Sequence, residues 1–336
     1  MIETMQRREF LNQLGTYAAL AGLSAAGVGI LAGESPAAAA PCIGKKKKSR
    51  YDAKGLPTVV LGRTGVVVPK MVLGLGSRFC HIDTDEEAWE MLNFALDNGL
   101  YYWDTAHAYD NSLALPKGKP KPTVKVYSEV RIAEVLKTRR KEVYLSTKVS
   151  SRNPDEALAE IEDSLKRLGT DHLEELKIHS VNSLEDVEEM SRPGHLIDIV
   201  HRMKDEKVCD HIGFSCHSDA YAAKAMCDRG DFDTMLIAMN QWDASHYSNR
   251  EGIAIPAAKA QGMGVMLMKL VRPKENRAGI DIPTLIKYAM SLDGPDAVCI
   301  GMDSHAIVQS NLDILRNFKK YSAAEMKRLA EALGPF

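Results

Sequence analysis

The chain has 336 residues, of which 45% are hydrophobic and 26% are charged, and its formal net charge is -2 at pH 7. This length and composition suffice for one large domain with a full core, and the near-zero charge argues against binding to nucleic acid or another polyanion. Its six cysteines include no C-x-x-C pair, so neither a disulfide framework nor an iron–sulfur motif is indicated.

The first forty residues have the pattern of a secretory signal. Arg7–Leu11 contains paired arginines followed by Phe and Leu, an apolar run rich in Ala and Gly covers 16–33, and Ala37–Ala40 provides an A-x-A cleavage site. The paired arginines resemble the twin-arginine type of signal. We therefore expect residues 1–40 to engage the twin-arginine export machinery, and the protein to fold in the cytoplasm and then reach the periplasm or another extracytoplasmic compartment.

Other interpretations of this segment are less favoured. The apolar run is near the lower length limit for a transmembrane helix and is interrupted by glycines, and Pro41 disfavours a lipid anchor at Cys42, so no stable membrane anchor is expected. Residues 41–55, which include the basic run Lys45–Lys48, are interpreted as a solvated linker. Gly27–Ala32 fits a dinucleotide-binding G-x-G-x-x-A pattern, but it lies inside the leader with no strand before it.

After the linker, apolar runs and amphipathic helical patterns alternate along residues 56–336. Thr58–Val68 is predicted to form a β-hairpin with Gly62 and Gly65 at its turn. The strands predicted to follow it are 71–76, 101–105, 143–149, 173–178, 211–215, 234–239, 265–270 and 297–300. The predicted helices are 84–98, 128–139, 153–168, 196–206, 220–227, 253–260, 282–292, 307–317 and 323–333.

This order predicts an α/β fold, a (β/α)8 TIM barrel with an N-terminal β-hairpin. Eight successive strand–helix units leave their strands parallel, and eight parallel strands can close into a barrel. An open doubly wound sheet usually has fewer units and a phosphate-binding fingerprint, which this segment lacks. In a barrel the C-terminal strand ends line the active face, and the polar residues expected there are Asp104, Lys148, His179, Ser215, Gln241 and Lys269.

The most informative segment is Tyr101–Tyr109, in which Asp104 and Tyr109 lie five residues apart. With Lys148 and His179 from the next two predicted strands, they supply a carboxylate, a phenol, an ammonium and an imidazole. Such a set can donate a proton to a carbonyl oxygen. Each residue alone has an ordinary explanation, such as rim packing, a solvated lysine, a turn cap or a structural histidine. Their place on successive strand ends favours an enzyme.

Over about residues 56–315 the chain resembles the aldo-keto reductase family. The matching features are the hairpin, Asp104 with Tyr109, Thr147 with Lys148, Leu168–Asp171 leading to His179, and Gly301 with Asn311 ten residues later. The resemblance implies an oxidoreductase that interconverts a carbonyl group (of an aldehyde, ketone or sugar) and an alcohol by transfer of a hydride from or to NAD(P)(H).

The resemblance also implies a role for each of the four residues. Tyr109 acts as general acid or base, and the Lys148 ammonium favours its ionised form because a free phenol is a weak acid. Asp104 holds Lys148 oriented and protonated, and His179 orients the carbonyl oxygen. No metal is needed, since charge builds on one oxygen only.

The residues that would bind the nicotinamide depart from the family pattern. Family members commonly use a Ser-Asn pair and a Gln; Ser215 and Gln241 match, but Cys216 stands in the Asn place with His217 beside it. Met268, which precedes Lys269, replaces the aromatic residue that often stacks on the nicotinamide. A thioether can still pack on a ring.

The ribose end of the cofactor site is expected near the last strand and helix, where Gly301 and Asn311 match the family. Relatives that use NADPH often carry Arg two residues after this Gly, whereas this chain has Asp303 there and Ile307 further on. A carboxylate would repel a 2′-phosphate and could accept hydrogen bonds from a 2′-hydroxyl. The hypothesis is a preference for NADH.

A zinc site is not expected. Cys209, His211, Cys216 and His217 are close in sequence, but the ends of a strand over 211–217 lie roughly 20 Å apart, too far for one ion.

Three points stay open. The Pro, Lys and Gly residues within 110–127 predict either an extended basic flap beside the active mouth or a surface loop. The chain could also be a barrel isomerase or epimerase that uses Tyr109 and Lys148 without net redox change, or a non-catalytic nucleotide-sensing scaffold.

Overall fold

The structure is a computed structural model that describes residues 49–113, 115, 122–239, 250–271 and 279–333. Within these residues, eight parallel strands close into a barrel in the order β10-β3-β4-β5-β6-β7-β8-β9, which confirms the predicted (β/α)8 fold. The barrel strands are β3 (Met71–Gly74), β4 (Tyr102–Asp104), β5 (Tyr144–Val149), β6 (Leu173–Val181), β7 (Cys209–Cys216), β8 (Thr234–Ala238), β9 (Gly264–Met268) and β10 (Ala297–Gly301).

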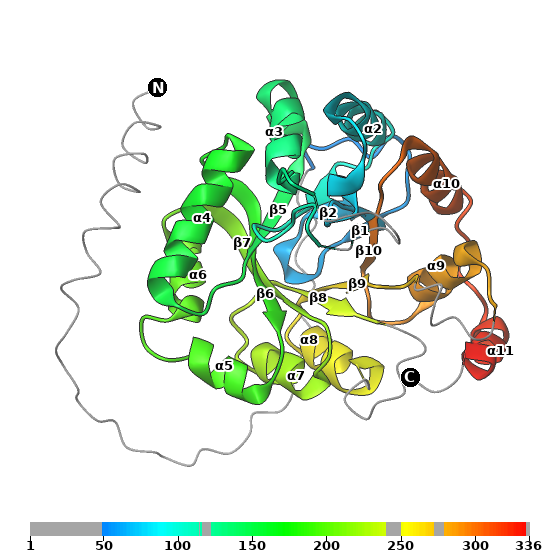
Figure 1. Ribbon diagram of the computed structural model, residues 1–336. Coiled ribbons are helices and arrows are strands. Elements are labelled where there is room, and N and C mark those ends of the chain that lie inside the picture. The colour runs from blue at the N-terminus through cyan, green and yellow to red at the C-terminus, as the bar shows by residue number, and fades with distance from the viewer. Residues whose placement is uncertain (1–48, 114, 116–121, 240–249, 272–278, 334–336) are drawn as a thin grey trace, which may run out of the picture.

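Helices surround the barrel, as Figure 1 shows in a view along its axis. They are α2 (Asp85–Asp97), α3 (Ser128–Arg139), α4 (Pro154–Leu168), α5 (Leu184–Met190), α6 (Leu196–Asp205), α7 (Ala220–Asp228), α8 (Ile255–Ala260), α9 (Ile282–Ser291), α10 (His305–Arg316) and α11 (Ala323–Leu333). No helix among the described residues is long and apolar enough to cross a membrane.

Helix α4 illustrates how local sequence fixes these elements. The side chain of Asn153 accepts hydrogen bonds from the amides of Asp155 and Glu156, and Pro154 occupies the first turn, where its missing N–H costs nothing. Gly169 ends the helix in the left-handed conformation, with φ of 64°. The helix buries one apolar face against the barrel, formed by Ala157, Ile161, Leu165 and Leu168.

The predicted hairpin is present and closes one end of the barrel. Strands β1 (Thr58–Val60) and β2 (Val67–Pro69) pair antiparallel, and their turn lies under the start of β9. A Cβ atom on Gly62 would meet the amide nitrogen of Gly264 at 2.1 Å, so the turn can approach the strand this closely only as glycine. The Arg63 guanidinium donates to the carbonyl of Gly230 at 2.9 Å and lies 3.6 Å from Asp233. This end of the barrel, where the strands begin, is the floor.

Most predicted bounds differ from those of the structure by one or two residues, and larger differences occur in three places. Helix α5 lies in a stretch that was predicted as loop, and β6 continues to Val181 rather than ending at residue 178. A π-helix at Arg250–Ala254 leads into α8, where an α-helix from residue 253 was predicted. Residues 1–48 lie outside the described residues, and with them the predicted leader and most of the predicted linker.

Candidate active site

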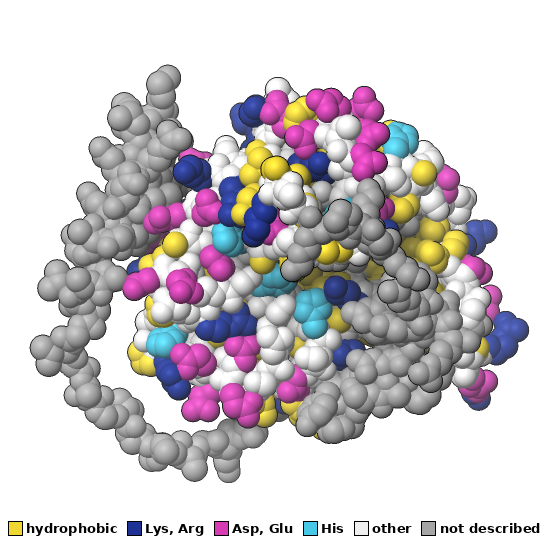
Figure 2. Space-filling model, in the orientation of Figure 1, with side chains coloured by type: hydrophobic (Ala, Val, Ile, Leu, Met, Phe, Trp, Pro, Cys, Tyr) yellow, Lys and Arg dark blue, Asp and Glu magenta, His cyan; other side chains and the backbone are white. Residues whose placement is uncertain are grey.

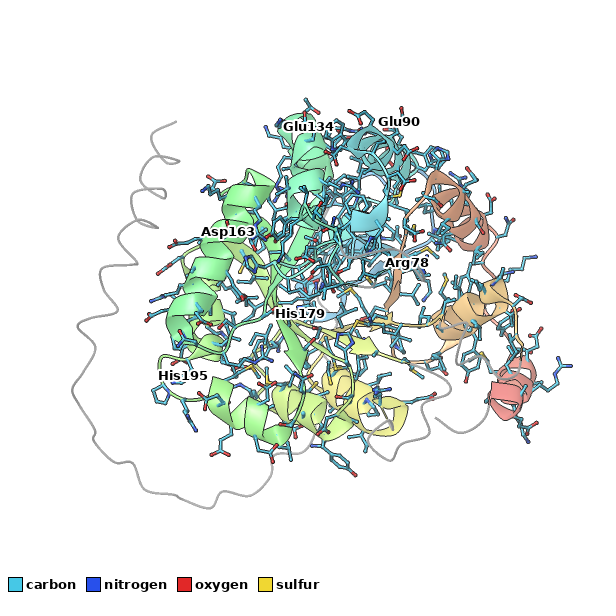
Figure 3. All side chains as sticks on the ribbon, viewed as in Figure 1. Arg78, Glu90, Glu134, Asp163, His179 and His195 are labelled. Atoms are coloured by element: carbon cyan, nitrogen blue, oxygen red, sulfur yellow. The ribbon has the colours of Figure 1, made fainter. Side chains whose placement is uncertain are left out.

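The open end of the barrel, opposite the floor, gathers polar side chains from neighbouring strands. Asp104 is the last residue of β4, Lys148 lies near the end of β5, and His179 lies near the end of β6. Tyr109 follows β4 in the connecting loop and returns to the same place. We call Asp104, Tyr109, Lys148 and His179 the proton-transfer cluster. His179 projects at the centre of the barrel in Figure 3, and histidine side chains lie at the centre of the same face in Figure 2.

An ion pair forms the base of this cluster. The Lys148 ammonium lies 2.5 Å from Oδ2 of Asp104 and donates to the carbonyl oxygen of Thr105 at 2.7 Å. Burial by itself lowers the pKa of Lys148, but the negative charge of Asp104 outweighs burial and raises it. Burial likewise raises the pKa of Asp104, and the Lys148 and Lys177 ammonium groups reverse this and lower it. The pair is therefore charged at neutral pH.

Tyr109 lies over this ammonium, with Nζ of Lys148 4.9 Å from the centroid of its ring. Burial raises the pKa of Tyr109, the Lys148 charge opposes that rise, and the net direction is upward. The Lys148 ammonium was predicted to favour the ionised form of Tyr109, but burial has the larger effect on its pKa. The phenol consequently keeps its proton at neutral pH and can donate it, while Lys148 stabilises the phenolate that donation leaves.

His179 meets Tyr109 edge to face, with ring centroids 5.4 Å apart and an interplanar angle of 87°. Burial, followed by the charge of Lys148, lowers the pKa of His179 to about 3, so its imidazole is neutral in the physiological range. Its Nδ1 is 3.1 Å from Oγ of Ser150. The Arg152 guanidinium holds the backbone of this region, because it donates to the carbonyls of Ser150 and His179 and pairs with Asp186.

Most of the other residues predicted to bind a cofactor lie at or just after the ends of the barrel strands. Ser215 lies buried at the end of β7, where its Oγ accepts a hydrogen bond from the Ser180 amide at 2.9 Å. Met268 ends β9 and is buried, and Lys269 follows it exposed, with φ of 63°. Gly301 ends β10 facing open space. Gln241 lies outside the described residues.

The remaining two predicted cofactor-binding residues are Asn311, on α10, and Asp303, which precedes that helix. Within the described part of the chain, Nδ2 of Asn311 is buried without a hydrogen-bond acceptor. Asp303 is not the isolated carboxylate that the sequence argument assumed, because Arg78 binds it with Nη2 at 2.6 Å and Nε at 2.8 Å. Figure 3 shows Arg78 near the end of the barrel beside α10. The two residues are 225 positions apart, so sequence alone gave no sign of this pair.

The residues considered for a zinc site lie along β7, and the loop considered as a flap is described only near its two ends. Cys209 and Cys216 occupy opposite ends of β7, and the described residues contain no group of three ligands that could hold a metal ion. Of the loop 110–127, residues 114 and 116–121 lie outside the described part. Its base is closed by an antiparallel bridge between Asp110 and Tyr127.

Sequence reasoning missed a second pair of charges, Glu175 and Lys177. Both side chains are fully buried inside the barrel, and Nζ of Lys177 lies 3.2 Å from Oδ1 of Asp104. A signal was present, because parallel strands buried on both faces usually read as continuous apolar runs, whereas β6 begins Leu-Glu-Glu-Leu-Lys.

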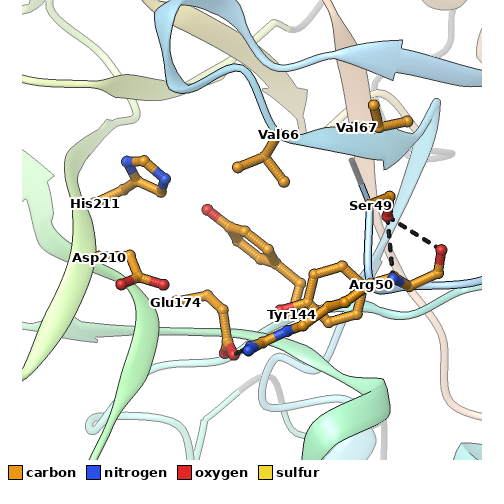
Figure 4. Close-up of a pocket in the computed structure, with 9 residues that line it drawn as sticks. Ser49, Arg50, Val66, Val67, Tyr144, Glu174, Asp210 and His211 are labelled. Atoms are coloured by element: carbon orange, nitrogen blue, oxygen red, sulfur yellow. Dashed lines mark hydrogen bonds and ion pairs between the residues drawn. The ribbon is translucent and has the colours of Figure 1, made fainter. Parts of the chain in front are cut away.

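A separate cavity of about 330 Å³ lies at the floor and not at this site. It is lined by Ser49–Tyr51, by Val66 and Val67 of the hairpin, and by residues at or near the starts of β5, β6 and β7 (Figure 4). There Arg50 and Arg140 both bind Glu174.

Comparison with known proteins gives a consistent result. Residues 70–272 match the model of the Aldo/keto reductase family. An uncharacterized oxidoreductase, YrpG, of Bacillus subtilis (strain 168) is 29% identical over 225 residues, which are 61% of this chain and 64% of that protein, just under two thirds of its length.

Solved structures share the fold. An aldo-keto reductase from Bacillus halodurans, AKR11C1 in its holo form, has a TM-score of 0.67 at 19% identity, covering 84% of this chain and 98% of its own. An aldo-keto reductase from Klebsiella pneumoniae in complex with NADPH has a TM-score of 0.62 at 20% identity, covering 84% and 96%.

Proposed function

The chain belongs to the aldo/keto reductase family of oxidoreductases, and from this membership we propose that it reduces a carbonyl group to an alcohol with NAD(P)H, and catalyses the reverse reaction. The observation that carries the proposal is the neighbourhood of Tyr109, a protonated phenol beside the buried Lys148–Asp104 ion pair and edge-on to the neutral imidazole of His179. A phenol, an ammonium and an imidazole converging on one point suit a reaction in which a single oxygen gains negative charge and then a proton.

The residues around the site fit a nicotinamide nucleotide. Among the described residues, the buried Nδ2 of Asn311 is a donor without an acceptor, which a nucleotide base can supply. Gly301 leaves open space at the end of β10, and the thioether of Met268 offers an apolar surface for a ring. When bound, NAD(P)H supplies the hydride; Ser215, Met268, Lys269, Gly301, Asp303 and Asn311, with Gln241, are the residues proposed to hold it.

The protein's own residues then handle the substrate oxygen. His179 donates from Nε2 and orients the carbonyl, since Ser150 occupies Nδ1. Tyr109 donates its proton to the oxygen as charge develops there. Lys148 stabilises the resulting phenolate, and Asp104 keeps Lys148 charged and in place. In alcohol oxidation the phenolate removes the proton instead.

Tyr109→Phe tests this proposal. We expect the variant to bind NADH and NADPH as the wild-type protein does, measured by quenching of intrinsic fluorescence. Its kcat for a panel of aldehydes, ketones and sugars should fall by about 10²–10⁴-fold, because positioned proton transfer is lost. Nucleotide binding by wild-type protein without any carbonyl turnover would instead favour a scaffold or an isomerase.

We propose further that NADH is preferred over NADPH. Arg78 is already bound to Asp303, so this ion pair offers less attraction to a 2′-phosphate than a free arginine would. Asp303→Asn releases Arg78 and removes the carboxylate proposed to accept from the ribose 2′-hydroxyl, so we expect the Kd for NADPH to fall by about fivefold while the Kd for NADH does not fall. Asp313→Asn, on the exposed face of α10, the helix that follows Asp303, is the control. An unchanged ratio of the two constants would contradict this role for the pair.

Export by the twin-arginine route is also a proposal. It rests on Arg7–Leu11 and Ala37–Ala40, and it places the mature protein in the periplasm or another extracytoplasmic compartment.

A further inference from the structure

The barrel interior holds two charges that the proposed reaction does not use. Glu175 and Lys177 both lie on β6, and their side chains are 0% exposed. Burying a charged group costs several kcal/mol unless partners satisfy it, and apolar residues of similar size usually give an equally stable core. Lys177 is level with Lys148 in the strand register, and two buried charges this close to the proton-transfer cluster call for a functional reason.

Their partners connect them directly to that cluster. Nζ of Lys177 lies 2.8 Å from Oε2 of Glu175, 3.2 Å from Oδ1 of Asp104 and 2.5 Å from Oγ of Ser146. Glu175 also accepts hydrogen bonds from the hydroxyl groups of Tyr102 and Thr234, so both of its oxygens are occupied. The ammonium of Lys177 and both carboxylate oxygens of Glu175 therefore have partners inside the barrel.

The result is a row of alternating charge that ends at Tyr109. Glu175 is negative, Lys177 positive, Asp104 negative and Lys148 positive, and Tyr109 lies over Lys148. Asp104 gives one carboxylate oxygen to each lysine: Oδ1 to Lys177 and Oδ2 to Lys148. Because Asp104 is shared, it neutralises Lys148 less completely than an undivided carboxylate would, and more of the Lys148 charge acts on Tyr109.

We propose that Lys177 and Glu175 are positioning residues that set, through Asp104, the positive charge that Lys148 presents to Tyr109. The positive charge of Lys177 offsets part of the negative charge of Asp104, so that Asp104 screens Lys148 less. The negative charge of Glu175 in turn offsets part of the charge of Lys177. This inference rests on the proposed function for its consequence in catalysis, but the charge coupling itself can be measured without turnover.

The surroundings leave few other groups that could titrate in the same range. Tyr109 faces Asp104, Lys148, His179 and Cys299, and Lys177 also faces Tyr102. Burial lowers the pKa of His179 to about 3, so this imidazole does not change charge in the alkaline range where Tyr109 ionises. Burial raises the pKa of Cys299 to about 12, so this thiol is the neighbour that can ionise there. Burial also raises the pKa of Tyr102 well above that of a free tyrosine.

The test follows the ionisation of Tyr109 by NMR in protein labelled with ¹³C at the tyrosine Cζ. The chain has 11 tyrosines, and the signal that disappears in Tyr109→Phe identifies this one. Lys177→Met removes a positive charge and should raise the midpoint by about one pH unit; Glu175→Gln removes a negative charge and should lower it by a similar amount. The double variant, which removes both charges, should lie between them.

Glu174→Gln is the matched control. Glu174 is a buried carboxylate on the same strand, one residue away, but successive side chains point to opposite faces, and it binds Arg140 and Arg50 near the floor. It should leave the Tyr109 midpoint unchanged even if it destabilises the fold. The rising limb of alcohol oxidation against pH should move with the NMR midpoint in each variant.

Shifts of opposite sign in Lys177→Met and Glu175→Gln, absent from Glu174→Gln, support the proposal. Equal midpoints in all variants, or shifts of the same sign in the two single variants, overturn it. If Lys177→Met fails to fold, the decision rests on Glu175→Gln and on the double variant, in which the remaining Asp104 and Lys148 charges still balance. The two single variants could shift the Tyr109 midpoint in opposite directions in a protein that turns over no carbonyl. The charge coupling would then stand, and the reductase function would be rejected.

Discussion

At the scale of single residues, the site depends on which proton each group carries. The phenol of Tyr109 is protonated and the imidazole of His179 is neutral because both are withdrawn from water, while Asp104 and Lys148 stay charged because they face each other. Burial alone would discharge all four groups. The close contact between Lys148 and Asp104 therefore keeps these two groups charged, while Tyr109 and His179 are neutral.

The orientation of the neutral imidazole depends on Ser150. In the proposed reaction its hydroxyl donates to Nδ1, which lies 3.1 Å away, and this leaves Nε2–H as the donor toward substrate. Ser150→Ala removes this restraint, and we expect kcat/KM for carbonyl reduction to fall by about five- to tenfold, as the loss of one hydrogen bond of ~1 kcal/mol implies. Ser151→Ala, which loses a hydrogen bond to Glu156 and one from the Asn153 amide at the surface, is the control. Unchanged kcat/KM in Ser150→Ala would show that His179 is oriented by other contacts.

Some residues of the candidate site could be predicted from sequence, and the reasons for the others are physical. Asp104, Tyr109, Lys148 and His179 stand at strand ends, and parallel strands in a barrel bring their ends together whatever their separation along the chain. The Arg78–Asp303 pair depends on the rotamers of two loop residues far apart in sequence, which no periodicity encodes. The charged residues of β6 were a signal for Lys177, but a strand pattern does not tell whether a charged side chain faces water or the barrel interior.

At the scale of elements, the end of β6 is the critical part of the barrel. Ser180 adopts φ of 56°, which is unusual for a residue with a side chain, and its amide binds Ser215 on the next strand. Arg152 fixes the same turn through the carbonyls of His179 and Ser180 and through Asp186 beyond it. The short helix α5 was missed from sequence because its seven residues carry too little apolar periodicity to distinguish it from a loop.

Arg152→Met tests this element. The change leaves Asp186, which is largely buried, without its partner and frees three carbonyl groups, so we expect the free energy of unfolding to fall by about 3 kcal/mol. The kcat should fall as well, since His179 loses its backbone support. Arg192→Met removes an exposed ion pair with Glu189 on α5 and should cost less than about 0.5 kcal/mol. Denaturant unfolding measures both variants. Equal free energies of unfolding for the two variants would mean that the turn after β6 does not depend on Arg152.

At the scale of the whole molecule, the two ends of the barrel have different tasks. The hairpin, Arg63 and Ser49–Tyr51 close the floor, and the proton-transfer cluster lies at the other end. The overall fold was predictable because each strand–helix unit repeats the same pattern. The π-helix at Arg250–Ala254 was not, because it breaks that pattern for a few residues only.

Two truncations test this division. A chain beginning at Ser49 keeps the Arg50–Glu174 ion pair and the stacking of Tyr51 on Tyr101, and we expect its thermal midpoint to equal that of the chain without its leader. A chain beginning at Pro57 loses both contacts and should be about 1–3 kcal/mol less stable, with kcat unchanged. In cell fractionation the full chain should be exported and the Ser49 chain retained. Retention of both would contradict the export proposal.

The buried Glu175–Lys177 pair has a consequence for engineering this protein. Procedures that seek higher thermostability replace polar residues in a core by well-packed aliphatic ones, and a buried ion pair is a frequent target because such replacements often succeed. If a barrel repacked with leucine or methionine at these two positions folds and melts at a higher temperature, it passes every test that such a procedure applies. Selection for heat resistance alone would then remove the charges that adjust the acid of the active site.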